Sequence, residues 1–107
     1  MWFRVAVAGG SMEPTLHEGD WLLARRVRDG ATVLAGEVVL VAHPGRGELL
    51  LVKRALRRTA EGWWVEGDNP DASDDSRTFG VVPDARVRAR VLVRYHPSPG
   101  WVRAGLG

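Results

Sequence analysis

Residues 85–95 read Ala-Arg-Val-Arg-Ala-Arg-Val-Leu-Val-Arg-Tyr. Alternate side chains of an extended chain point to opposite faces, so this segment has an apolar face and an arginine face. It is the clearest β-strand signal in the chain. No segment of the sequence shows a sustained helical period. The arginine face is read as solvated, with contact to an acidic substrate or an anionic lipid as the alternative. We therefore predict a mainly β protein.

Shorter strand patterns flank this segment. Turn residues separate apolar or alternating stretches, and the stretch His43–Gly47 has the composition of a hairpin turn. The predicted strands are residues 2–8, 21–27, 37–42, 48–56 and 63–66, with a return to the sheet at 79–82. The fold class is a single domain of antiparallel, coiled sheets over residues 1–96. Residues 97–107, rich in proline and glycine, are predicted to form a flexible C-terminal tail.

Composition limits the function classes. The chain has 107 residues, 45% hydrophobic and 26% charged, which is typical of one soluble globular domain. It has no cysteine, which excludes disulfides, thiolate metal sites and a cysteine nucleophile. The net charge of +2 comes without a Lys/Arg block, so no nucleic-acid partner is expected. The three histidines, His17, His43 and His96, lack metal-ligand spacing, and no metal or cofactor is expected.

The N-terminus bears on location. The apolar run Val5–Ala8 is much shorter than the roughly 20 residues that span a bilayer, and it is too short for a complete signal peptide. We expect a cytoplasmic location, or membrane association if an upstream anchor is missing from this chain. Exposed tryptophans could contact a membrane surface without spanning it, although core positions are the default for them.

Three separated blocks contain residues that could take part in catalysis: Gly9–Leu16, Lys53-Arg54 and Gly67–Arg77. A serine hydroxyl is a poor nucleophile at neutral pH and needs a neighbouring base. Gly9 and Gly10 would let the backbone beside Ser11 approach a substrate closely. The alternative is that Gly-Gly-Ser is only a loop.

Lys53 is the candidate base. Residues two apart on a strand share a face, so Lys53 lies with Leu51 and Ala55, whereas Arg54 lies on the opposite face. Both faces are largely apolar. Desolvation, together with the adjacent cation Arg54, would lower the pKa of Lys53 towards the range that a general base needs. The alternative is a lysine whose stem follows the sheet while its ammonium reaches water.

Taken together and in order, these blocks resemble the conserved boxes of the type I signal peptidase family, endopeptidases with a Ser/Lys dyad. The match covers about residues 9–80, and the box Gly67-Asp68-Asn69 through Ser73–Arg77 is its most specific part. The resemblance implies the sheet architecture of the signal peptidase and LexA-like catalytic core. It also implies a precursor protein as partner, whose N-terminal pro- or signal segment binds as an extended strand.

The resemblance also implies residue roles. Ser11 would be the nucleophile and Lys53 its general base, and Ser73 would orient the lysine amine. Asp75 and Arg77 would form a structural ion pair near the dyad, and the Ser11 N–H would be one oxyanion donor. Some family members have a serine where this chain has Gly9, so the second oxyanion donor is not identified. No metal or cofactor is implied.

The short length is similar to that of small maturation proteases of nickel-type superoxide dismutase, which remove an N-terminal propeptide. This subgroup is the favoured reading. The alternatives are a signal peptidase that lacks its membrane anchor, a LexA-like self-cleaving regulator, and an inactive peptide-binding module.

Overall fold

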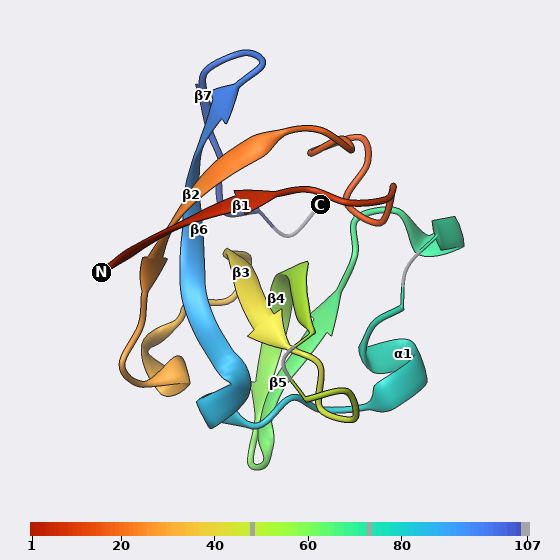
Figure 1. Cartoon of the computed structure of the whole chain (residues 1–107). Coiled ribbons are helices and arrows are strands. Elements are labelled where there is room, and N and C mark those ends of the chain that lie inside the picture. Colours follow the sequence, from red (N-terminus) through yellow and green to blue (C-terminus); the bar gives the residue numbers. More distant parts are fainter. Residues whose placement is uncertain (48, 73, 106–107) are drawn as a thin grey trace.

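The alternating arginine segment forms β6 (Val87–His96), on which the sheet is centred. In the computed structural model, which describes residues 1–47, 49–72 and 74–105, β6 pairs antiparallel with β2 (Trp21–Arg26) and with β3 (Val38–Ala42). The sheet has the order β1-β2-β6-β3-β4-β5, and β7 pairs with β6 (Figure 1). The remaining strands are β1 (Trp2–Ala6), β4 (Leu50–Thr59), β5 (Gly62–Glu66) and β7 (Gly100–Trp101). The predicted mainly β, antiparallel fold is confirmed.

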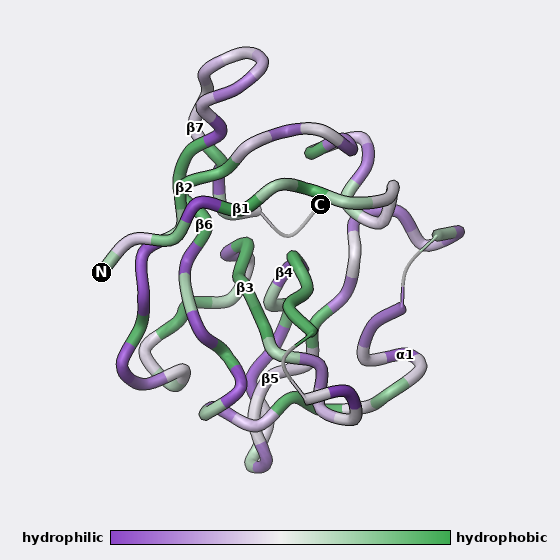
Figure 2. Tube along the Cα trace, in the orientation of Figure 1, coloured by the Kyte–Doolittle hydropathy of each residue, from purple (hydrophilic) through white to green (hydrophobic). Residues whose placement is uncertain are grey.

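The core lies on both faces of β3. All five residues of this strand are buried, because Val38 and Leu40 face one hydrophobic cluster while Val39 and Val41 face another. The first cluster is completed by β1, β2 and β6 and by Met12 and Leu16 from the loop after β1. A strand covered on both faces reads as a continuous apolar run, and Figure 2 shows this run along β3.

Four short helical segments connect the strands: η1 (Gly30–Thr32), η2 (Pro70–Ala72), α1 (Ser76–Phe79) and η3 (Asp84–Arg86). They account for two wrong predictions. Phe79 ends α1 rather than starting a strand, and only Val82 bridges to the sheet, opposite Trp63. The strand predicted from residue 85 begins at Val87, because η3 turns the chain first.

The C-terminal segment makes backbone hydrogen bonds that its composition does not indicate. β7 pairs with β6 at Val93 and Arg94, and the Val102 N–H donates to the Leu92 carbonyl at 2.8 Å. The Gly105 N–H donates to the Gly36 carbonyl at 3.0 Å. The region predicted as a flexible tail therefore contributes a short edge strand, β7. The prolines before it and the glycine within it are uncommon in strands, so the local sequence does not indicate one.

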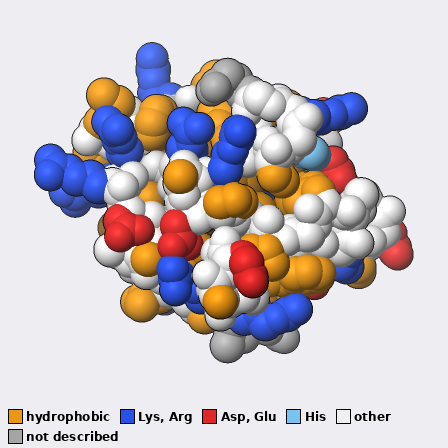
Figure 3. Space-filling model, turned by 90° about the horizontal axis from the view of Figure 1, so that it is seen from below, with side chains coloured by type: hydrophobic (Ala, Val, Ile, Leu, Met, Phe, Trp, Pro, Cys, Tyr) orange, Lys and Arg blue, Asp and Glu red, His pale blue; other side chains and the backbone are white. Residues whose placement is uncertain are grey.

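The arginine face of β6 is half-buried rather than uniformly solvated. Arg90 pairs with Glu37 at 3.1 Å, and Arg94 donates to the Ser98 carbonyl at 2.7 Å. Basic side chains elsewhere stand among hydrophobic ones, as the face in Figure 3 shows. Among the described residues, every helix is too short or too polar to cross a bilayer.

Candidate active site

The turn that carries Ser11 follows β1 and is held at its base by the sheet. The Val7 N–H donates to the Asp20 carbonyl at 2.9 Å, and the Gly19 N–H donates to the Val7 carbonyl at 3.0 Å. Met12 and Leu16 are each 1% exposed and pack into the first core cluster. Ser11 itself is only half-buried. Buried side chains thus fix the turn from one side and leave Ser11 accessible.

The two glycines before Ser11 have different surroundings. Gly9 has φ of 76°, a left-handed conformation that favours glycine. The Gly10 carbonyl accepts a hydrogen bond from the Asn69 side-chain amide at 3.0 Å, and the Ser11 carbonyl accepts one from the Asn69 N–H at 2.9 Å. Within the described part of the chain, no hydrogen bond occupies the Ser11 N–H. Asn69 therefore fastens the loop after β5 to the Ser11 turn.

A buried ion pair supports this junction. Arg54 of β4 donates to both carboxylate oxygens of Asp68, at 2.9 Å and 2.7 Å, and Thr15 donates to the same carboxylate. Another Arg54 nitrogen donates to the Gly36 carbonyl at 2.8 Å. Burial alone would raise the pKa of Asp68, but the hydrogen bonds from Arg54 and Thr15 bring it below its ordinary value. Arg54 thus links β4 through Asp68 to the Ser11 turn.

Sequence reasoning did not predict this ion pair. Two features of the sequence could have indicated it. Arg54 lies within an apolar strand, and Asp68 follows Gly67, the first residue after β5. Sequence alone does not pair two residues 14 positions apart on different elements.

Lys53 lies in the middle of β4 and is 2% exposed. Its backbone partner is Val39, and Ala55 and Leu51 on its face belong to or pack against the second core cluster. Burial lowers the pKa of Lys53 from its ordinary value, whereas Asp75 and Asp74 oppose that shift and Arg77 reinforces it. The expected effect of desolvation is confirmed. The expected cation was wrong, because Arg54 points to Asp68 and Arg77 is the contributing cation.

Asp75 and Arg77 form an ion pair in the structure. The Arg77 guanidinium donates to the two Asp75 carboxylate oxygens at 3.0 Å and 2.6 Å. Asp75 is fully buried, and it also accepts hydrogen bonds from the Gly67 N–H at 2.9 Å and the Arg77 N–H at 3.0 Å. The carboxylate therefore caps α1 and closes the loop that began at Gly67.

The structure thus arranges the three sequence blocks around one loop. Residues 67–77 contact the Ser11 turn through Asn69, and Asp75 of the same loop acts electrostatically on Lys53. Ser73, the residue expected to orient the lysine, lies outside the described residues. Among those described, no group of three or more His, Cys, Asp or Glu is arranged to hold a metal ion.

The loop of residues 67–77 therefore links the turn of the accessible Ser11 to the surroundings of the buried Lys53. Residues 2–91 match the Peptidase S24-like family, so the chain belongs to that family. It is 32% identical to mitochondrial inner membrane protease subunit 1 of Xenopus tropicalis, over 87% of this chain and 68% of that protein. It is 34% identical to mitochondrial ATP-independent inner membrane protease subunit 1a of Arabidopsis thaliana, over 85% of this chain and 68% of that protein. The human subunit 1 is 26% identical, over 94% of this chain and 74% of that protein.

These relatives support a signal-peptidase-like protease, in line with the resemblance found from the three blocks. They are named as inner membrane proteases and not as maturation proteases of a superoxide dismutase. Nothing in these comparisons supports the expected cytoplasmic location.

Proposed function

We propose that this protein is a serine endopeptidase that removes an N-terminal pro- or signal segment from a precursor protein. Ser11 is the nucleophile and Lys53 its general base. The observation that carries the proposal is Lys53: it is an amine 2% exposed, with a lowered pKa, beside the loop that also holds the Ser11 turn. Burying a lysine costs free energy, and a titratable group with a strongly perturbed pKa marks a candidate functional site.

The reaction follows the Ser/Lys variant of triad chemistry. Neutral Lys53 accepts the proton of the Ser11 hydroxyl as its oxygen attacks the scissile carbonyl, and the resulting ammonium protonates the leaving amine. Lys53 then activates the water that hydrolyses the acyl-enzyme. The Ser11 N–H, which no described group occupies, is suited to donate to the oxyanion. Asp75 and Arg77 position the loop near the lysine, and the family resemblance assigns Ser73 the role of orienting the amine.

A precursor segment would bind as an extended strand between the outer edge of β1 and the start of β4. β1 ends the sheet order, so its outer edge has no strand neighbour among the described residues. β5 pairs with β4 only from Arg54 onward, so in the described part of the chain no strand pairs with Leu50–Val52 on that side. Phe3 of β1 and Leu50 of β4 line one cavity, so the starts of the two strands approach each other there. A strand added there would run towards Ser11.

The test of this function is the mass of a precursor before and after incubation with the purified chain. A nickel-type superoxide dismutase precursor and a precursor with a signal-type leader are compared, because the first is the substrate that the resemblance to the small maturation proteases implies. We expect one N-terminal cleavage that is absent with Ser11→Ala. Clipping of the enzyme itself would favour a LexA-like regulator. Binding without cleavage, unchanged by Ser11→Ala, would favour a peptide-binding module.

The cleavage rate should rise with pH, because only the neutral Lys53 amine accepts a proton. Burial lowers the pKa of Lys53, so the rise should be centred below the ordinary lysine value of 10.5. Removing the repulsive cation with Arg77→Gln should move the rise to higher pH. Removing an attractive carboxylate with Asp74→Asn should move it to lower pH. The measurement is kcat/KM against pH for the three proteins, and shifts in the same direction would contradict the assigned base.

We further propose that the chain acts at a membrane surface. Trp2, Trp21 and Trp101 are 53%, 40% and 75% exposed. Register places them on the outward face of β1, β2 and β7, with Arg25 opposite Trp2. Tryptophan and arginine on one face suit the boundary between lipid headgroups and acyl chains. The names of the inner membrane relatives point the same way.

A Trp21→Ser/Trp101→Ser variant should bind anionic vesicles several-fold more weakly, because interfacial binding scales with buried apolar area. Its cleavage of a short soluble peptide should be unchanged. Leu34→Ser, at a 67% exposed side chain in the loop before β3, is the matched control and should not alter vesicle binding. Equal vesicle binding by the double variant and the wild type, measured by sedimentation, would refute the membrane role.

A further inference from the structure

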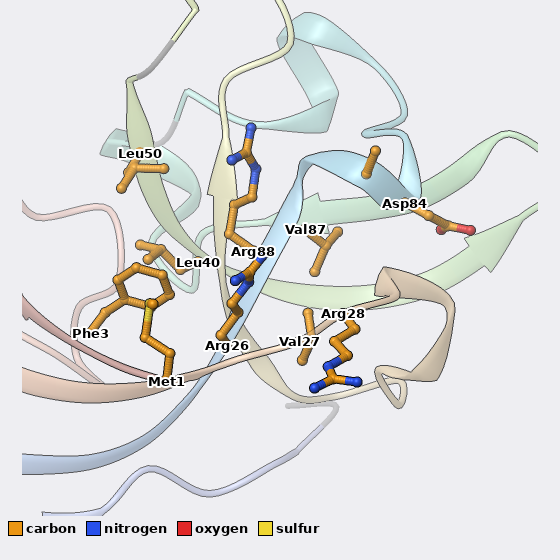
Figure 4. Close-up of a pocket in the computed structure, with 11 residues that line it drawn as sticks. Met1, Phe3, Arg26, Val27, Arg28, Leu40, Leu50, Asp84, Val87 and Arg88 are labelled. Carbon is orange, nitrogen blue, oxygen red and sulfur yellow. The ribbon is translucent and has the colours of Figure 1, made fainter.

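A cavity of about 370 Å³ lies beside the start of β1, at the end of that strand remote from Ser11. Its apolar side consists of Met1, Phe3, Leu40 and Leu50, which gather on one side of the view in Figure 4. Phe3 also packs against the first core cluster, so this wall is continuous with the hydrophobic core. The cavity can therefore take an apolar chain segment.

The other side of the cavity carries arginines among the apolar residues Val27, Ala85 and Val87. Arg26, Arg28 and Arg88 line it, and Figure 4 shows Arg26 and Arg88 next to the apolar group. The acidic lining residue among those described is Asp84, and its carboxylate is engaged by Arg58 in a close ion pair. Three guanidinium groups outnumber this one carboxylate, of which one oxygen pairs with Arg58 and the other is buried without a partner among the described groups. The net positive charge of the lining therefore favours an anion beside the arginines.

Arg88 is aimed into the cavity by a β-bulge. Leu40 of β3 pairs with Ala89, and Val41 pairs with Val87, so Arg88 is the extra residue on β6. Bulges commonly redirect a side chain. The Nε atom of Arg88 is buried and has no hydrogen-bond partner among the described groups. A buried donor without a partner is uncommon and costs free energy, which an incoming acceptor would recover.

The cavity lies along the path of the proposed substrate strand. Inward-facing Phe3, Val5 and Val7 follow one another along the segment that leads to the Ser11 turn, and Val7 is buried. At roughly 3.3 Å per residue, Phe3 lies about 13 Å from Val7 along an extended chain. Leu50, at the start of β4, lines the same cavity as Phe3. A peptide that reaches Ser11 along β1 would therefore pass the cavity about four to six residues from the scissile bond.

We propose that this cavity is a distal substrate subsite that binds an acidic side chain, carried about five residues from the cleaved bond on the part of the precursor that runs along β1. The proposal rests on the proposed endopeptidase function. The carboxylate accepts from the Arg88 Nε and is neutralised by Arg26 and Arg28, while neighbouring apolar side chains of the substrate pack against Phe3 and Leu50. Arginine presents a planar set of donors that matches a carboxylate.

The test uses a peptide series cleaved by the wild type, in which one glutamate is moved residue by residue along both sides of the scissile bond. We expect kcat/KM to increase about tenfold at a single position four to six residues from the bond. This preference should vanish in Arg88→Gln and weaken in Arg26→Gln, whose side chain is exposed and whose loss should not disturb folding. Arg57→Gln, an exposed arginine at the far end of β4, is the matched control and should keep the preference.

Binding gives a readout independent of turnover. A fluorescent peptide with the preferred glutamate should bind the Ser11→Ala protein about tenfold more tightly than its glutamine counterpart, and Arg88→Gln should remove the difference. Cleavage of all peptides without any positional preference would overturn the subsite while leaving the endopeptidase function intact. If Arg88→Gln reduces binding to anionic vesicles and leaves the peptide preference unchanged, the cavity is a lipid site and the proposal is wrong.

Discussion

Replacing Lys53 by methionine should reduce kcat/KM for precursor cleavage by about a thousandfold or more, the scale seen when one member of a catalytic dyad or triad is lost. Methionine is similar in length and apolar, so it fills the same space on β4 without an amine. Ser11→Ala should cause a comparable loss. The two losses arise from the same proton transfer, so the double variant should be hardly worse than either single variant.

The stability of Lys53→Met separates catalysis from structure. Burial disfavours the charged lysine in the folded state, so the unfolded chain binds more protons between the lowered pKa and the ordinary value of 10.5. Stability therefore rises with pH through that window, and at lower pH the wild type carries the full penalty. Lys53→Met should unfold at equal or higher denaturant concentration than the wild type at neutral pH. Near-normal cleavage by Lys53→Met, or losses that multiply in the double variant, would rule out a Ser11–Lys53 dyad.

Asp68→Ala should have the largest effect on stability. It leaves the Arg54 guanidinium, whose side chain is 10% exposed, without its carboxylate partner. Breaking one half of a buried ion pair costs about 3–5 kcal/mol, a large share of the 5–15 kcal/mol that stabilises a typical domain. It also removes the acceptor of Thr15, so the loop that holds the Ser11 turn should loosen and cleavage should fall with stability.

Urea unfolding provides the measurement, with Asp71→Ala as the control, since Asp71 is an exposed aspartate on the same loop. Adding Arg54→Met to Asp68→Ala should restore part of the stability, because no unpaired charge is then buried.

The pKa of Asp68 is lowered in the fold, so its ion pair contributes fully to stability above the ordinary value of 3.8 and progressively less below it. The difference between wild type and Asp68→Ala should therefore shrink in acid. A constant difference down to pH 2 would show that the ion pair is not its cause.

Local patterns predicted the strands well for a physical reason. The period of two along β6 indicates one mainly buried face, and the continuous apolar run of β3 indicates two buried faces. Burial of apolar side chains is the main determinant of where strands form. The same parity placed Lys53 and Arg54 on opposite faces of β4, which the two core clusters confirm. The order of the three blocks supported the protease family without any structure.

The sequence by itself determined most of the strands and the protease family, because each depends on neighbouring residues or on short ordered motifs. Only the tertiary structure decided that Arg54 pairs with Asp68, that Arg77 rather than Arg54 acts on Lys53, and that Arg88 turns into a cavity at a bulge. It also decided that the C-terminal segment adds β7 to β6. These contacts join residues far apart in the chain, and their geometry depends on how the strands pair, which no local periodicity encodes.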